Sequence, residues 1–354
     1  MTEARHPAET LADVGEEGLL ARIFPELPRG TRTILGPGDD AAVIAADDGR
    51  VVVSTDVLVE GRHFRRDWSS GADVGWRAAM QNLADIAAMG ARSSSLVVAL
   101  VAPPDLPVEW AVGFARGLHE ACEPHGVGVV GGDLSGGDAI VVAVTVHGDL
   151  GGRAPVLRSG ASPGDVVAHA GVAGRSAAGH TVLASGRLDL LDDRAERPGA
   201  QVALAAGDAV RAYRRPEPPL EAGLRASDAG ASAMMDVSDG LLRDAGRMAR
   251  ASGVVIDLGR VEDAFAADLE ALAPLAAELG ADPKEWVLAG GEDHGLLATF
   301  PPGAALPAPF RAIGVVRAIT EAPAAGGAPG VLVAGAAPTL LSPGWDHFRP
   351  RPVD

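Results

Sequence analysis

Acidic side chains gather at several points of this sequence where a carboxylate could come close to a ligand. Short apolar runs lead into glycine and aspartate at GPGDD (36–40), VSTD (53–56), VVGGD (129–133) and MMDVSDG (234–240), and Asp85 adds a carboxylate from a predicted helix. Glycine lets the backbone turn sharply and approach a ligand. Carboxylates at strand ends point into the crevice where α/β proteins bind small molecules. We therefore expect these aspartates to converge on one binding site.

The set of carboxylates predicts bound metal ions. One aspartate in a turn usually bonds only its own backbone, but several converging anions are unfavourable without cations. The chain has 30 Lys and Arg against 47 Asp and Glu, and its arginines are scattered, so basic side chains cannot supply the neutralising charge. Oxygen ligands select Mg²⁺, Mn²⁺ or Ca²⁺. Because Mg²⁺ sites commonly take substrate phosphates as further ligands, a phosphate-rich substrate is expected.

The usual phosphate-binding loops are absent from the sequence. There is no G-x-x-x-x-G-K-[ST] loop, and the single lysine, Lys284, does not fit a protein-kinase pattern. A nucleotide would have to be held by metals and main-chain N–H groups, since a chain of net charge −17 repels an uncompensated triphosphate. We expect Ser238 or Asp239 to cap a helix that begins near Leu241, whose N–H groups would attract anions.

Composition excludes several other classes of protein. A net charge of −17 argues against nucleic-acid binding. The first residues, MTEARHPAET, lack the apolar segment of a signal peptide, and no apolar run approaches the ~18 residues of a membrane span. The only cysteine, Cys122, precludes an internal disulfide and fits a reducing compartment. We interpret the chain as a soluble cytoplasmic protein with no nucleic-acid or membrane partner.

The order of strands and helices predicts two domains of mixed α/β or α+β layers. The length of 354 residues agrees with this at roughly 150 residues per domain. We predict a flexible tail over 1–14, a first domain over 15–150 and a second over 151–354. A helix begins near residue 15, strands over 41–44 and 51–55 pair with each other, and Asp56 lies where the second of them ends.

The ordered motifs resemble the thiamine-monophosphate kinase family, within the superfamily of aminoimidazole ribonucleotide synthetase-like ATP-dependent enzymes. The resemblance runs from about Gly15 to Phe348 and is carried by GPGDDAAVI, STDVLVEGRHF, NLADIAAMGA, VVGGDLSGGD, GRAPVLRSGASPGD, MDVSDGL, GGED and GWDHF. It implies a two-domain α/β (α+β) fold with mixed sheets packed with helices. It also implies a homodimer built through the first domain, an ATP- and Mg²⁺-binding role for that domain, and a nucleotide lying between the two domains.

The resemblance also implies the reaction, in which ATP as co-substrate phosphorylates thiamine monophosphate to thiamine diphosphate with several Mg²⁺ ions. This is the last step of thiamine diphosphate biosynthesis. The acceptor is itself an anionic phosphate, so direct in-line transfer needs charge neutralisation and alignment and no acid-base catalyst. Catalysis would act through metal held by Asp56, Asp133 and Asp239.

The family pattern can be carried onto individual residues of this chain. The metal-binding positions match Asp40, Ser54, Thr55, Asp56, Asp85, Asp133, Asp236 and Asp239. The ATP positions match Gly132, Asp133, Arg158 and Ser238. The thiamine-phosphate positions match His63, Glu292 and Trp345, and Asp39 is expected to play a supporting role.

Two residues differ from the family pattern, and two alternative functions remain possible. Leu134 stands where many relatives have a hydroxyl residue, and His294 replaces the commoner tyrosine after GGED, which leaves local substrate packing unpredicted. Another ATP-dependent enzyme of the same superfamily could share the metal and ATP residues. Selenophosphate synthetase-like and hydrogenase-maturation members are disfavoured because this chain lacks their cysteines. A non-catalytic nucleotide- or metal-binding relative is the other alternative, although the complete carboxylate set argues against it.

Overall fold

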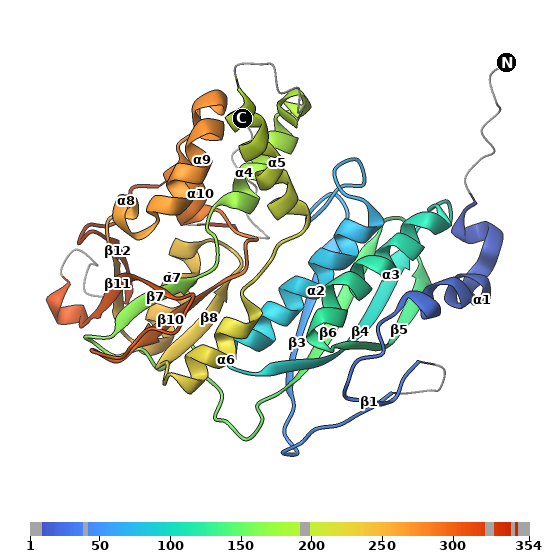
Figure 1. Cartoon of the computed structure of the whole chain (residues 1–354), viewed down its shortest axis with the longest axis horizontal. Helices are drawn as coiled ribbons and strands as arrows, with labels where there is room; N and C mark the ends of the chain where they lie inside the picture. The colour runs from blue at the N-terminus through green and yellow to red at the C-terminus, as the bar shows by residue number, and fades with distance from the viewer. Residues whose placement is uncertain (1–8, 38–41, 192–198, 323–328, 341–343, 346–354) are drawn as a thin grey trace. The chain divides into compact units, whose positions relative to one another are not determined.

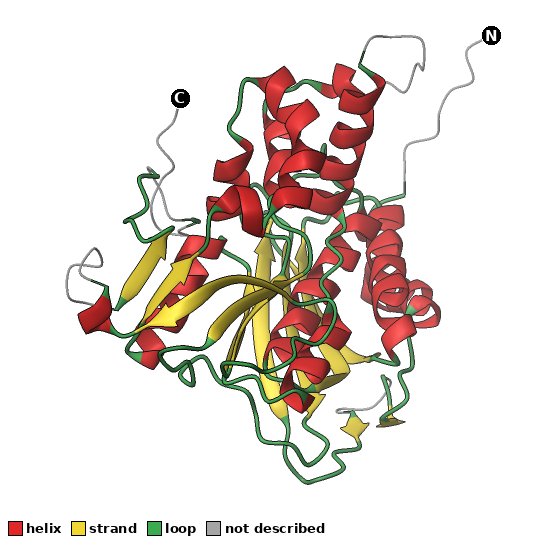
Figure 2. Cartoon of the chain, turned by 60° about the vertical axis from the view of Figure 1, so that its left-hand side comes forward, coloured by secondary structure: helices red, strands yellow, loops and turns green. Residues whose placement is uncertain are grey.

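The computed structural model describes residues 9–37, 42–191, 199–322, 329–340 and 344–345. The chain divides into two units (Figure 1). Unit 1 comprises Met1–Ile86 and Arg92–Gly152, and unit 2 comprises Ala87–Ala91 and Arg153–Asp354. Each unit combines a sheet with helices (Figure 2), so the mixed α/β architecture predicted from the sequence is confirmed.

The main sheet of unit 1 has four strands in the order β3-β6-β4-β5. The pairs β3–β6 and β6–β4 are antiparallel, and β4–β5 is parallel. A parallel pair needs a crossover connection, which helix α3 supplies, and helices α2 and α3 lie against one face of the sheet (Figure 1). The bounds are β3 Val52–Val59, α2 Gly71–Ala88, β4 Arg92–Ala102, α3 Val108–Cys122, β5 Gly128–Gly136 and β6 Val141–Asp149.

Helices α2 and α3 approach each other closely because glycines face the contact. A Cβ at Gly71 would lie 2.0 Å from the Trp110 carbonyl oxygen, and one at Gly117 would lie 2.0 Å from that of Ala72. Such distances leave no room for any side chain. The close contact fixes the position of α2, which carries several polar residues of the candidate site.

The N-terminal elements of unit 1 differ from those predicted. Helix α1 spans Leu11–Ile23, so it begins within the segment predicted as a tail. Thr10 and Asp13 explain the early start, because the Thr10 N–H and hydroxyl both donate to the Asp13 carboxylate in a capping box. Gly15, where the helix was expected to begin, is a kink with φ of 65° between two helical segments, and the second segment follows it to Ile23 as predicted.

The predicted pairing of strands 41–44 and 51–55 is wrong. Strand β2 (Val43–Ile44) pairs with β1 (Thr33–Leu35), and β3 pairs with β6. The longer strand β6 offers β3 a ladder of eight residue pairs, and a two-residue strand cannot compete with it. Asp56 consequently lies inside β3 and not at its end. Asp133 in β5 and Asp236 in β8 (Ala233–Val237) likewise lie within strands.

Unit 2 is built on a sheet of six strands in the order β12-β9-β11-β7-β10-β8. The core beside β7 and β10 is made of small and aromatic side chains, including Ala168, Ala298 and Phe300, onto which Ala222 and Ala226 of α6 pack. The strands are β7 Val166–Ala170, β8 Ala233–Val237, β9 Val255–Leu258, β10 Gly295–Phe300, β11 Arg311–Arg317 and β12 Gly330–Val333.

The helices of unit 2 fall into two sets. Helices α4, α5, α9 and α10 pack against one another, whereas α6 and α7 pack on strands, and α7 also contacts α10 (Figure 1). Their bounds are α4 Arg175–Ala184, α5 Ala200–Arg214, α6 Leu220–Asp228, α7 Leu241–Ser252, α8 Val261–Ala264, α9 Ala266–Leu279 and α10 Pro283–Ala289, with short 3₁₀ turns at Leu188–Leu191 and Ile319–Glu321. The 3₁₀ turns of unit 1 are Phe24–Glu26 and Glu123–His125. Of the helices in the described residues, none has the length and apolar character needed to span a bilayer.

Candidate active site

Three of the predicted metal ligands meet on one face of the unit 1 sheet. Ser54 and Asp56 are two apart in β3, so their side chains point to the same face, which α2 covers. The Ser54 hydroxyl donates to Asp85 Oδ2 at 2.6 Å. Gln81 Nε2 donates to Asp56 Oδ2 at 3.3 Å. The result is a cluster of two carboxylates and a hydroxyl held between a strand and a helix.

Thr55 lies on the opposite face of the same strand. Its hydroxyl donates to the Val144 carbonyl oxygen at 2.9 Å and lies 3.2 Å from the Thr145 hydroxyl. Alternation along a strand makes this unavoidable once Ser54 and Asp56 face the helix. The side chains of the three consecutive residues of the STD motif therefore do not converge on one point.

Asp133 is separated from this cluster within unit 1. Strand β5 lies three positions from β3 in the sheet, which corresponds to roughly 14 Å at the usual strand spacing. Its carboxylate is exposed and accepts a hydrogen bond from Ser135 Oγ at 2.9 Å. Gly132 is also exposed, and a Cβ there would lie 2.0 Å from the Val98 carbonyl oxygen. Leu134 packs against the apolar cluster of α1 and α3, so its departure from the family pattern serves the core.

His63 is held by a tight loop between β3 and α2. The Val59 N–H donates to His63 Nδ1 at 2.9 Å, and Arg77 Nη1 donates to the His63 carbonyl oxygen at 3.0 Å. Because Nδ1 accepts a hydrogen bond, the ring carries its proton on Nε2 in this arrangement. Phe64 anchors the loop, being buried and stacked 6.3 Å from Trp110 between ring centroids.

The sequence interpretation missed Arg77 and Gln81. Arg77 is buried, with 2% of its surface exposed, and Gln81 contacts Asp56 as described above. A signal for both was present, because Arg77, Gln81 and Asp85 recur every four residues along an Ala-rich helix and so share a face. These three side chains on one face of α2 connect the His63 loop to the carboxylate cluster.

Three motifs far apart in the sequence meet in unit 2. The Glu292 N–H donates to the Ser238 carbonyl oxygen at 2.9 Å, and the Trp345 N–H donates to that of Asp239 at 2.8 Å. Glycine permits both contacts, since a Cβ at Gly291 would lie 2.2 Å from the Ser238 oxygen and a Cβ at Gly344 would lie 2.2 Å from the Asp239 oxygen. The two predicted substrate residues Glu292 and Trp345 are thus attached to the loop that carries the predicted metal and ATP residues.

His294 lies between two of the predicted site residues. Its Nδ1 is 3.4 Å from Asp236 Oδ2, and its Nε2 is 3.7 Å from Glu292 Oε2. The pairing of Leu296 with Asp236 in the β8–β10 ladder brings the residue before β10 to this place. Burial lowers the pKa of the His294 imidazole, but the interaction with the carboxylates of Asp236 and Glu292 outweighs it and raises the pKa to about 10.

Asp293 anchors the same loop to helix α4. Its carboxylate accepts hydrogen bonds from the Gly174 N–H at 2.6 Å and the Ser176 N–H at 2.8 Å, at the start of that helix. Burial raises the pKa of the Asp293 carboxyl to about 7, although both amide hydrogen bonds act in the opposite direction. The anchor fixes the residues on either side of Asp293, which are Glu292 and His294.

The expectation that arginines cannot neutralise the carboxylates is wrong for Asp239. Arg247 Nη2 contacts Asp239 Oδ2 at 2.6 Å, and Arg247 Nη1 contacts Asp244 Oδ1 at 2.5 Å. Burial raises the pKa of the Asp244 carboxyl to about 6. Asp239 and Arg247 are eight residues apart across the start of α7, so two helical turns bring them together, which overall composition does not reveal.

The predicted cap of α7 is also wrong. The N-cap residue is Gly240, and in the described part of the chain no side-chain hydrogen bond caps this helix. Asp244 Oδ2 instead accepts the Asp239 N–H at 2.9 Å, so the first turn is closed from inside the helix. The N–H groups and the helix dipole at the start of α7 therefore favour a bound anion there, although no side chain caps the helix.

The remaining predicted residues are only partly placed. Arg158 is exposed, and its carbonyl oxygen accepts the Ser252 hydroxyl at 2.9 Å, which fixes its backbone beside the end of α7. Asp39 and Asp40 lie outside the described residues. Unit 1 holds His63 and the cluster around Asp56, and unit 2 holds the loops that meet at Ser238.

The donor chemistry fits Mg²⁺. Within the described residues, which omit Asp39 and Asp40, no group of three or more His, Cys, Asp or Glu side chains is arranged to hold a metal ion. The Asp56 cluster nevertheless supplies two carboxylates and a hydroxyl, all oxygen donors. Mg²⁺ commonly keeps water and takes substrate phosphates beside one or two protein carboxylates, so this donor set suits it.

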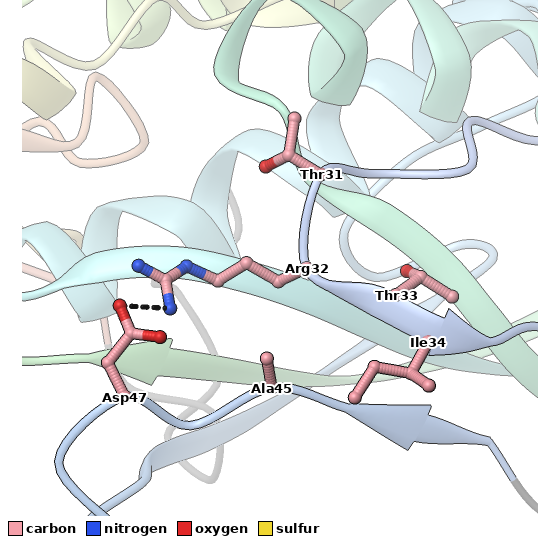
Figure 3. A pocket seen from close by; sticks show the side chains of 6 residues that line it. All are labelled: Thr31, Arg32, Thr33, Ile34, Ala45 and Asp47. Carbon is pink, nitrogen blue, oxygen red and sulfur yellow. Dashed lines mark ion pairs between the residues drawn. The ribbon is translucent and has the colours of Figure 1, made fainter.

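A separate open depression of about 380 Å³ lies beside β1 and β2 in unit 1. It is lined by Thr31, Arg32, Thr33, Ile34, Ala45 and Asp47 (Figure 3). The Arg32 guanidinium is engaged by Asp47 at 2.7 Å and by the buried Asp149 at 3.1 Å. It contains none of the predicted site residues, and its cation is already paired, so it is not the candidate active site.

Comparison with known proteins agrees with the motifs. The family model of the AIR synthase related protein N-terminal domain matches residues 38–150. Thiamine-monophosphate kinase of Mycobacterium tuberculosis is 47% identical over 307 residues, covering 87% of this chain and 86% of that relative.

Solved structures give the same picture of the fold. AaThiL complexed with AMPPCP and TMP matches with a TM-score of 0.69 at 29% identity, over 98% of this chain and 100% of that one. Hydrogenase maturation protein HypE matches with a TM-score of 0.60 at 19% identity, over 87% of this chain and 90% of that one, which shows a shared fold alone. The identity to the mycobacterial enzyme across most of both chains, together with the meeting of the GGEDH and DVSDG loops, shows that this chain belongs to the thiamine-monophosphate kinase family.

Proposed function

We propose that this chain phosphorylates thiamine monophosphate to thiamine diphosphate with ATP, by direct Mg²⁺-assisted transfer between the two phosphates. The observation that carries the proposal is the 47% identity to a thiamine-monophosphate kinase over 87% of the chain. The local geometry supports it, because Glu292 and Trp345 are attached by backbone hydrogen bonds to the loop that carries Asp236, Ser238 and Asp239.

The chain's own residues have distinct roles in this proposal. Asp56 and Asp85, with Ser54, would hold Mg²⁺ on the α2 face of the unit 1 sheet. The chemistry supplied by Mg²⁺ held by these residues would be neutralisation of phosphate charge. Because the Val59 N–H occupies Nδ1 of His63, the Nε2–H of His63 would be the atom that donates to the thiamine phosphate.

Unit 2 would supply the other groups. Asp236 and Asp239 would contribute further metal ligation, and the N–H groups at the start of α7 would contact the ATP phosphates beside Ser238. Arg158 would clamp a nucleotide phosphate. Glu292 and Trp345 would hold the thiamine moiety, the indole by stacking on a flat heteroaromatic ring. Gly132 and Asp133 of unit 1 would contact ATP and metal.

We also propose that the protein is a homodimer through the open face of the unit 1 sheet. On the face opposite α2 and α3, Val53 is 57% exposed, Val57 46% and Val97 36%. Alternation with buried Leu58, Leu96 and Val98 places these valines together on that face. An exposed apolar sheet face of this kind favours burial against another protein surface, and a second copy presents the same face.

Replacing Val57 with aspartate is expected to convert the dimer to a monomer. A charge in the middle of an apolar contact would be desolvated without a partner. Light scattering coupled to gel filtration measures the mass directly. Leu188→Asp, at a 55% exposed residue of unit 2, is the matched control and should leave the mass unchanged. A Val57→Asp protein of unchanged dimeric mass would place the contact elsewhere.

The proposed reaction is tested by identifying its product. Purified protein is incubated with ATP, Mg²⁺ and thiamine monophosphate, and the thiamine species are separated by chromatography. One thiamine diphosphate should form for each ADP. Unphosphorylated thiamine is the control acceptor and should give no diphosphate. Release of ADP without thiamine diphosphate, or tight ATP binding without turnover, would contradict the proposal.

A further inference from the structure

The loop around Asp293 has an unusual backbone. Among the described residues, three that are not glycine have a positive φ, and two of these are Glu292 at 71° and His294 at 52°. Such conformations are costly and persist where the surroundings impose them. Here two sets of hydrogen bonds impose the conformation. The Asp293 carboxylate accepts N–H groups at the start of α4, and the Glu292 N–H donates to the Ser238 carbonyl oxygen. The loop is therefore held in one strained shape that turns Glu292 and His294 toward each other.

The imidazole of His294 lies between two carboxylates of different exposure. Its side chain is 4% exposed, that of Asp236 is 6% exposed, and that of Glu292 is 36% exposed. Nδ1 makes a hydrogen bond with Asp236 at 3.4 Å, whereas Nε2 has no hydrogen-bond partner among the described residues. Glu292 Oε2 is 3.7 Å from this buried nitrogen, and a buried polar atom left without a partner is costly.

We propose that His294 is a positioning residue for thiamine monophosphate: Asp236 fixes its ring through Nδ1, and its Nε2 holds the Glu292 carboxylate in the orientation that binds substrate. The inference rests on the proposed function, in which Glu292 contacts thiamine monophosphate. A separation of 3.7 Å needs only a small side-chain movement to become a hydrogen bond, and such bonds often tighten when substrate binds. The carboxylate that faces outward is thereby given one preferred position.

A pair of substitutions separates the contacts made by the two ring nitrogens of the imidazole. In His294→Asn the amide reaches about as far as Nδ1, so the contact with Asp236 can persist while the contact with Glu292 is lost. In His294→Gln the longer side chain reaches about as far as Nε2, so the contact with Glu292 can persist. We expect the asparagine variant to bind thiamine monophosphate about 10-fold more weakly than the glutamine variant, which corresponds to about 1.4 kcal/mol.

A purely structural role for His294 predicts the opposite order. Asparagine is well tolerated at a positive φ and glutamine is less so, so strain alone would favour the asparagine variant. The order of the two affinities therefore distinguishes positioning of Glu292 from relief of backbone strain. The ratio of the KM values for thiamine monophosphate should follow the same order, whereas the KM for ATP should differ little between the two variants.

Binding is measured by calorimetry with thiamine monophosphate in the presence of Mg²⁺ and without ATP, on full-length protein. Thermal unfolding of each variant shows that it is folded. Weaker binding by the asparagine variant than by the glutamine variant supports the inference. Equal affinities, or the reverse order, with normal binding by the unaltered protein, overturn the inference alone. Failure of the unaltered protein to bind thiamine monophosphate overturns the proposed function as well.

Discussion

Replacement of Asp56 by asparagine is expected to lower kcat by more than about 100-fold, because even residues behind metal ligands commonly contribute 10- to 100-fold. The Asp56 carboxylate belongs to the cluster with Ser54 and Asp85, and asparagine preserves its volume while removing its charge. Thiamine diphosphate formation at saturating substrates gives kcat, and circular dichroism checks the fold. The midpoint of a Mg²⁺ titration should move to higher concentration.

The matched control for this variant is Asp67→Asn. Asp67 is an exposed aspartate of the same unit, paired with Arg65 at 2.7 Å, and exposed pairs of this kind contribute little to stability. Its removal should leave kcat unchanged within about twofold. Near-normal turnover by Asp56→Asn would remove Asp56 from the metal site, and equal losses in both variants would point to a general effect of lost charge.

Replacement of Gly291 by alanine is expected to lower kcat/KM by about 100-fold or more. The new Cβ would lie 2.2 Å from the Ser238 carbonyl oxygen, so the GGEDH and DVSDG loops could no longer contact each other as they do. A misplacement of about 1 Å at a phosphoryl-transfer site can cost this much. Overpacking should also destabilise the fold by about 1–3 kcal/mol. Steady-state kinetics and chemical unfolding measure the two effects separately.

Gly207→Ala is the control for Gly291→Ala. Gly207 lies in α5, where an added Cβ meets nothing within 4 Å, so alanine should stabilise the helix by roughly 0.5–1 kcal/mol without affecting catalysis. If Gly291→Ala loses stability but keeps its kcat/KM, then the contact between the two loops is structural and does not position Glu292.

The sequence was most informative where a requirement is local. The glycines of VVGGD and MMDVSDG mark places where the backbone can turn sharply and approach a ligand, and this is visible in residue type alone. The contact of Gly291 with Ser238 joins two segments far apart in the sequence, and residue type alone does not specify it. The mixed α/β fold follows from the alternation of strand and helix patterns in the same way.

The parts that could not be predicted depend on which strand pairs with which. Ser54 and Asp56 share a face and Thr55 does not, but this follows only if β3 continues through Asp56. That continuation is imposed by β6, about ninety residues later in the chain. The neutralisation of Asp239 by Arg247 and the support of His63 by Arg77 depend on helix faces that composition does not resolve. Four-residue spacing of polar residues was the available signal in both cases.

The central claim is that divalent cations join the anionic groups of this chain to two anionic reactants. The most direct measurement removes metal from the purified protein by chelation and dialysis, then follows thiamine diphosphate formation from ATP and thiamine monophosphate as Mg²⁺ is returned. We expect no product without metal and full recovery of turnover as Mg²⁺ is restored. Turnover that is undiminished after chelation would contradict the account.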